Sequence, residues 1–170
     1  MKTIKSILII IILLILGCDA YKVKRDLNDE PILGEKMFYK FSEKPNANDL
    51  KIIDTTSFYV QIFEGRYYND EEKANPFFYK FHSDGYFKQS SIKYDDNFRY
   101  RTKNSLYYGG KYRIIGNTIE LEYFVPSRGS RTNIFGRAIE KGRLENGKIY
   151  FDNKENNSLF SVYEKKSSLN

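Results

Sequence analysis

Residues 110–123, with the sequence GKYRIIGNTIELEY, limit the possible fold more than any other segment of the chain. If Gly116-Asn117 is a two-residue turn, the flanking residues pair with one another as the arms of an antiparallel hairpin. Counting outward pairs apolar residues on one face and opposite charges on the other: Ile114 with Ile119, Tyr112 with Leu121, Arg113 with Glu120, and Lys111 with Glu122. A shift by one residue would bury the charges, so the segment predicts a hairpin of defined register with one buried face.

A second hairpin is predicted around Asn146-Gly147, a dipeptide that favours a tight turn. Glu145 then pairs with Lys148 on the outer face, so opposite charges again face each other. Further from the turn, the alternation of apolar and polar residues fails at Glu140 and Gly142. This irregularity predicts a bulge or a bend in the strand.

The rest of the chain from Lys51 onward has the same character. Short runs rich in β-branched and aromatic residues alternate with turn residues, and the whole sequence holds 15 Tyr and 13 Phe but no Trp. Strands with one apolar face must close into a barrel or stack as a sandwich, and successive hairpins without a long crossover favour closure. We therefore predict an all-β domain over residues 51–165, an antiparallel up-and-down barrel of about 8–10 short strands.

Three segments of this region carry a resemblance to a known class of domain: FHSDGYF (81–87), GKYRIIGNTIELEY (110–123) and GRLENGKIYF (142–151). Together they resemble the small lipocalin-like domains found in many bacterial lipoproteins. The resemblance implies a lipocalin-like barrel that holds a small apolar or amphipathic ligand without chemical change.

The N-terminus has the layout of a secretory signal peptide. Lys2 and Lys5 precede the apolar run Ile7–Leu16, and the small residue Gly17 follows. Ten apolar residues rise only about 15 Å as a helix, roughly half the thickness of the hydrocarbon core, so a transmembrane helix is the weaker interpretation. Residues 1–17 are therefore predicted to be a signal peptide.

Cys18, the chain's single cysteine, directly follows this signal. The stretch Ile15-Leu16-Gly17-Cys18 resembles the lipobox of bacterial lipoproteins. The resemblance implies cleavage between Gly17 and Cys18 and acylation of Cys18, so that acyl chains hold the protein on a membrane of the bacterial cell envelope. Residues 18–50 are then a lipidated tether followed by an N-terminal segment without a clear secondary-structure pattern.

The sequence offers little catalytic chemistry. His82 is the only histidine, and no Gly-x-Ser-x-Gly motif is present. The acidic pairs Glu71-Glu72 and Asp95-Asp96 lie in polar segments, and Gly109-Gly110 leads into a strand and not into a phosphate-binding helix. We predict no catalytic residue, metal site or cofactor. The net charge of +6 comes from interleaved basic and acidic residues, which argues against binding to nucleic acid.

Two groups of residues are candidates for ligand contacts. Tyr112, Leu121 and Tyr123 share the predicted inner face, where they either fill the core or line a cavity. Arg128 and Arg131 flank a glycine in a predicted loop, and two guanidinium groups so placed suit an anionic group. Two functions remain open: a barrel that binds a small ligand, or a packed barrel whose loops contact an envelope or host protein.

Overall fold

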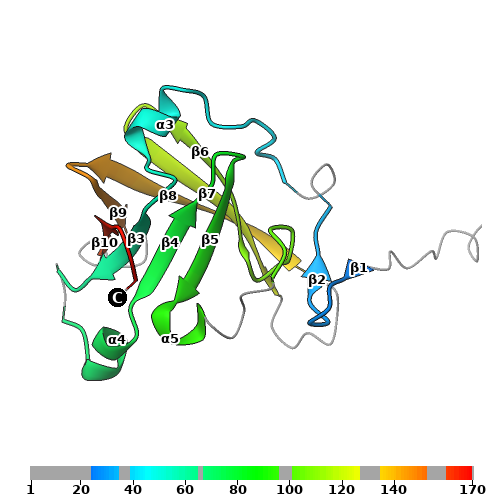
Figure 1. The fold of residues 1–170 in the computed structure, drawn as a ribbon, viewed down its shortest axis with the longest axis horizontal. Coiled ribbons are helices and arrows are strands. Elements are labelled where there is room, and N and C mark those ends of the chain that lie inside the picture. Colours follow the sequence, from blue (N-terminus) through cyan, green and yellow to red (C-terminus); the bar gives the residue numbers. More distant parts are fainter. Residues whose placement is uncertain are drawn as a thin grey trace, which may run out of the picture.

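A computed structural model describes residues 24–34, 39–64, 67–95, 101–126, 135–152 and 160–169. Eight antiparallel strands form a closed barrel in which each strand pairs with the next along the chain and the last pairs with the first (Figure 1). The strands are β3 (Phe58–Ile62), β4 (Phe77–Phe81), β5 (Tyr86–Ser91), β6 (Gly109–Ile115), β7 (Thr118–Pro126), β8 (Phe135–Glu145), β9 (Lys148–Asp152) and β10 (Phe160–Lys166). The prediction of an antiparallel up-and-down barrel is confirmed.

The hairpin of β6 and β7 has the predicted register. Tyr112 pairs with Leu121, Ile114 with Ile119, and the charged pairs lie on the opposite face. The inner side chains of this hairpin belong to the barrel core, whereas the guanidinium of Arg113 contacts the carboxylate of Glu120 on the outside, with 2.7 Å between Nε and Oε2. Alternation in the sequence was therefore sufficient to orient both strands.

The hairpin of β8 and β9 also turns at Asn146-Gly147, where both residues adopt positive φ (52° and 76°) as a tight turn requires. The predicted bulge near Glu140 is wrong, because β8 pairs with β7 without interruption from Phe135 to Arg143. Gly142 faces inward. A side chain has no room at this position, because the ring of Phe151 occupies the space: an added Cβ would lie 2.7 Å from Cε1 of Phe151. Regular alternation then places Glu140 inside the barrel.

One end of the barrel is densely packed. The short helix α3 (Asp49–Ile52) lies at this end in Figure 1, and Ile53, which follows it, is fully buried. Ile53 forms one core cluster with aromatic and branched side chains from all around the barrel: Tyr59, Tyr79, Phe81, Phe87, Tyr112, Ile119, Leu121, Ile149, Phe151 and Tyr163. The helices α4 (Asp70–Ala74) and α5 (Ile92–Asp95) lie at the opposite end (Figure 1).

A second layer covers part of the outside of the barrel. It contains the two-stranded sheet of β1 (Lys24–Arg25) and β2 (Pro31–Ile32) and the extended segment from residue 39 onward. Leu33 and Tyr39 from this layer pack with Leu106 and with Phe124 on the outer face of β7. Residues 30–34 and 39–41, which belong to the segment without a clear secondary-structure pattern, are thus part of the folded domain.

The layer is also held by a buried carboxylate. Glu122 is fully buried on the outer face of β7 and accepts hydrogen bonds from the backbone N–H groups of Lys40 and Phe41, at 2.8–2.9 Å. Arg137 of the neighbouring strand lies with its Nε 2.9 Å from the same carboxylate. Glu122 therefore joins the covering segment to two barrel strands.

The predicted signal peptide and Cys18 lie outside the described residues, as do Arg128 and Arg131. Within the described ranges, no helix combines the length and the apolar character needed to cross a membrane.

Candidate functional site

The end of the barrel opposite α3 contains a cavity of about 380 Å³. A volume of this size is in the range of small-molecule binding sites. Six of the eight strands contribute to its wall, and α4 with the residue that ends it contributes the rim. The lining residues are Gln61, Glu72, Asn75, Phe77, Tyr79, Gln89, Tyr123, Glu140, Ser161 and Tyr163.

Three tyrosines form the inner part of this cavity. The rings of Tyr79 and Tyr163 meet edge to face with centroids 4.7 Å apart. Burial raises the pKa of both side chains and also that of Tyr123, so all three hydroxyls are neutral at physiological pH. The tyrosines thus supply both aromatic surface and hydroxyl groups that donate and accept hydrogen bonds.

Glu140 is the charged group on the inner wall. It lies on β8 opposite Leu121 and one inward position along the strand from Gly142. Burial raises the pKa of its carboxyl. No described residue forms a hydrogen bond or an ion pair with this carboxylate. Its exposure to the cavity makes it available to a ligand.

The rim of the cavity is fixed by the first turn of α4. The side chain of Asn69 accepts a hydrogen bond from the backbone N–H of Glu72, and the carboxylate of Glu72 accepts one from the backbone N–H of Asn69, at 2.8 and 3.0 Å. This reciprocal capping box is a stable way to begin a short helix. It also holds Glu72 and Asn75 at the mouth of the cavity.

The three inner-face residues that the sequence predicted as candidates lie in two different parts of the barrel. Tyr123 lines the cavity. Tyr112 and Leu121 are fully buried in the packed half of the barrel, where the hydroxyl of Tyr112 donates a hydrogen bond to the carbonyl of His82 at 2.9 Å. These two residues therefore belong to the core and not to the cavity wall.

Sequence reasoning missed Glu140. The signal is a charged residue at an inward-facing position, but the same break in alternation also predicts a bulge or a bend. In a strand with unbroken pairing, a charged inward residue indicates that the barrel is not filled at that level.

His82 does not belong to a catalytic arrangement among the described residues. Its Nε2 lies 2.7 Å from the hydroxyl of Tyr108, beside the turn between β4 and β5. Burial, with a smaller contribution from the charge of Lys103, lowers the pKa of His82, and burial raises the pKa of Tyr108 to about 12. Among all the residues that the structure describes, no cluster of three or more His, Cys, Asp or Glu side chains could hold a metal ion.

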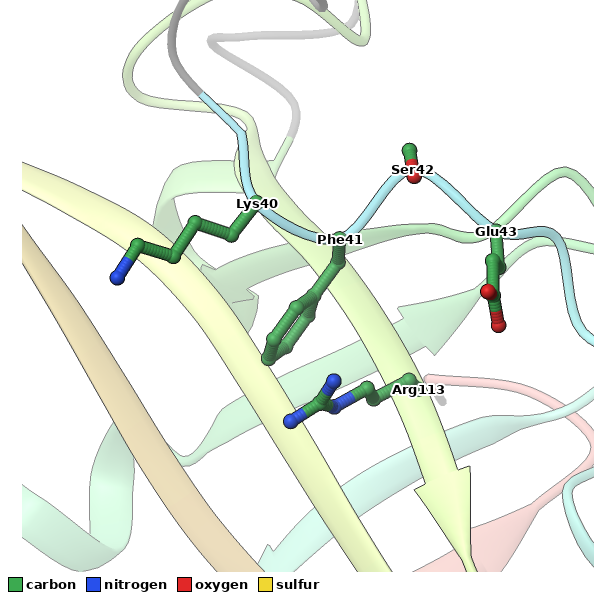
Figure 2. A pocket seen from close by; sticks show the side chains of 5 residues that line it. All are labelled: Lys40, Phe41, Ser42, Glu43 and Arg113. Carbon is green, nitrogen blue, oxygen red and sulfur yellow. The ribbon is translucent and has the colours of Figure 1, made fainter.

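A smaller pocket of about 100 Å³ lies on the outer surface, between the covering segment and β6 (Figure 2). Figure 2 shows the ring of Phe41 pointing toward the guanidinium of Arg113, whose Cζ is 4.3 Å from the ring centroid. Because Arg113 also pairs with Glu120 at 2.6 Å, its charge is already compensated. This pocket is therefore a weaker candidate than the cavity inside the barrel.

Comparisons with protein families, with curated proteins and with solved structures find no match to this chain.

Proposed function

We propose that this chain is a lipid-anchored binding protein of the bacterial cell envelope that holds a small amphipathic ligand in the open end of its barrel. The observation that carries the proposal is the cavity of about 380 Å³, which lies in the same barrel as a fully packed core. A barrel with only a structural role gains stability by filling both ends, because unfilled space forfeits packing contacts.

The wall favours an amphipathic ligand over a purely apolar one. Phe77 and the tyrosine rings offer apolar surface, whereas Gln61, Gln89 and Ser161 offer amide and hydroxyl groups. An apolar ligand would leave the amide of Gln89 and the hydroxyl of Ser161 without water or another partner, which costs free energy. A ligand with an apolar body and a polar group would satisfy both kinds of surface.

Binding without chemical change fits the lining better than catalysis. Glu72 is engaged in the capping box of α4, and among the described lining residues Ser161 has no His or Lys beside it to act as its base.

A larger side chain at position 123 tests the proposal. Tyr123→Trp should fill part of the cavity and reduce the small-molecule content of the purified protein at least about fivefold, while the far-UV circular dichroism spectrum stays unchanged. The measurement is extraction of the denatured protein followed by mass spectrometry of the extract.

Tyr150→Trp is the matched control. Tyr150 lies on the outer face of β9 beneath the guanidinium of Arg143, so the substitution adds the same volume outside the barrel. Equal ligand content in the two variants would contradict binding in this cavity.

The envelope anchor is tested separately. Cys18→Ser removes the only thiol of the chain, and the protein should then leave the membrane fraction and fail to incorporate a labelled fatty acid. Asp19→Ala, one residue further, should change neither result. A Cys18→Ser protein that remains in salt-washed membranes would show that acyl chains on Cys18 are not the anchor.

A further inference from the structure

The carboxylate of Glu140 is the feature that the proposed ligand must explain. It projects from β8 into the cavity, with Leu121 opposite it on the neighbouring strand. The three cavity tyrosines are close enough for the charge of Glu140 to influence the ionisation of each of their hydroxyls. Glu140 therefore shares the cavity wall with all three tyrosines.

A carboxylate in this position is costly without a positive partner. Withdrawal of the group from water disfavours its charged form, and this desolvation is the cause of its raised pKa. Among the described residues that line the cavity there is no Lys, Arg or His to compensate the charge of Glu140. The cavity therefore has the electrostatic character of a cation site.

The aromatic rings favour the same kind of ligand. The faces of tyrosine rings attract cations, and sites for ammonium groups combine such rings with a carboxylate. Tyr79, Tyr123 and Tyr163 come from three different strands and line the same cavity as Glu140, so a ligand bound there would lie against more than one tyrosine. Their neutral hydroxyls can accept hydrogen bonds from an ammonium group.

We propose that the polar group of the ligand is a protonated amine that pairs with Glu140 and is surrounded by Tyr79, Tyr123 and Tyr163. This inference rests on the proposed function, because it names the ligand class for the same cavity. The apolar part of the ligand would lie against the tyrosine rings and Phe77 toward the mouth.

Two probes of nearly equal shape test the charge requirement: 2-phenylethylamine, which is cationic at pH 7, and 2-phenylethanol, which is neutral. The full-length mature protein is solubilised in a neutral detergent, any bound molecule is removed by extensive dialysis, and each probe is titrated by calorimetry. We expect the amine to bind at least about tenfold more tightly than the alcohol.

Glu140→Gln keeps the shape of the side chain and removes its charge. Affinity for the amine should fall at least about tenfold, whereas affinity for the alcohol should change less than about twofold. Glu145→Gln is the matched control, because it removes a carboxylate from the same strand, β8, but on the outer face, where Glu145 pairs with Lys148 and lies near Arg143. It should change the affinity for the amine less than about threefold.

The fold of the Glu140→Gln variant is checked independently. Removal of a desolvated charge should leave its thermal midpoint at pH 7 no lower than that of the wild type. Equal affinity for amine and alcohol, or an amine affinity unchanged by Glu140→Gln, would overturn the inference. So would failure of the amine to bind.

These outcomes are distinguishable from failure of the proposed function. A neutral or anionic molecule extracted from wild-type protein and lost in Tyr123→Trp would overturn the amine inference and leave the binding function intact. The absence of any extracted molecule, together with no binding of either probe, would overturn both.

Discussion

Glu122→Ala is expected to lower the free energy of unfolding by about 2–5 kcal/mol, because two backbone N–H donors lose their acceptor at a cost of about 1–3 kcal/mol each. The substitution leaves the N–H groups of Lys40 and Phe41 without their acceptor and removes one partner of the half-exposed Arg137. Each buried donor left unsatisfied adds to the loss. The measurement is urea unfolding followed by circular dichroism.

Glu120 supplies the matched control on the same face of the same strand. Its carboxylate pairs with Arg113 and Lys141, whose side chains are 49% and 59% exposed and can turn to water when it is removed. Glu120→Ala should therefore cost only about 1 kcal/mol. If Glu122→Ala is too unstable to purify, Glu122→Gln, which keeps one acceptor oxygen, should lie between the two. Equal losses for Glu120→Ala and Glu122→Ala would show that Glu122 does not secure the covering layer.

Gly110→Ala is the second substitution with a large expected effect. A Cβ at this position would lie 2.0 Å from the backbone carbonyl oxygen of Glu122 and 3.1 Å from the Cα of Tyr123, so β6 and β7 would have to move apart. Because the obstacle is backbone, no side-chain rotation relieves the contact. We expect a loss of about 3 kcal/mol or more in the free energy of unfolding, again measured with urea.

Gly136→Ala distinguishes this steric effect from a general effect of glycine in strands. Gly136 lies on β8, and its added Cβ would meet the side chain of Val125 at an ordinary distance of 3.8 Å. The expected change in stability is within about 0.5 kcal/mol. Losses of similar size at positions 110 and 136 would mean that the close approach of Gly110 to β7 has no energetic importance.

Much of the barrel follows from local pattern. The paired charges and apolar residues around Gly116-Asn117 determined the register of β6 and β7, because only one register keeps the charges outside. The sequence predicts a closed barrel but does not predict which residues of β10 and β3 pair with one another. The individual pairs, such as Val162 with Ile62, depend on contacts between the two ends of the barrel that no local pattern specifies.

The covering layer could not be predicted for a related reason. Glu122 was assigned to a solvent-facing position opposite Lys111, and the alternation of β7 gave no sign that another segment would bury it. The two N–H groups that bind it come from Lys40 and Phe41, about eighty positions away in the chain. Burial produced by a distant segment without regular structure leaves no periodic signal.

The candidate site was predicted in part. Inward-facing tyrosines were identified from alternation, but only the level within the barrel decides which of them reaches the cavity: Tyr112 lies in the packed half, whereas Tyr123 lies in the open half. Glu140 was misjudged because a bulge and an inward charge produce the same break in alternation. Pairing of Glu140 with Leu121 in an unbroken ladder distinguishes the two.

A native mass spectrum of the mature protein, released gently from the membranes of the cells that make it, tests the central claim most directly. If the cavity holds a ligand, the spectrum should contain a species heavier than the acylated polypeptide by one small molecule, and denaturation should remove the extra mass. A single peak at the mass of the acylated polypeptide, unchanged after incubation with an extract of the cell envelope, would contradict ligand binding.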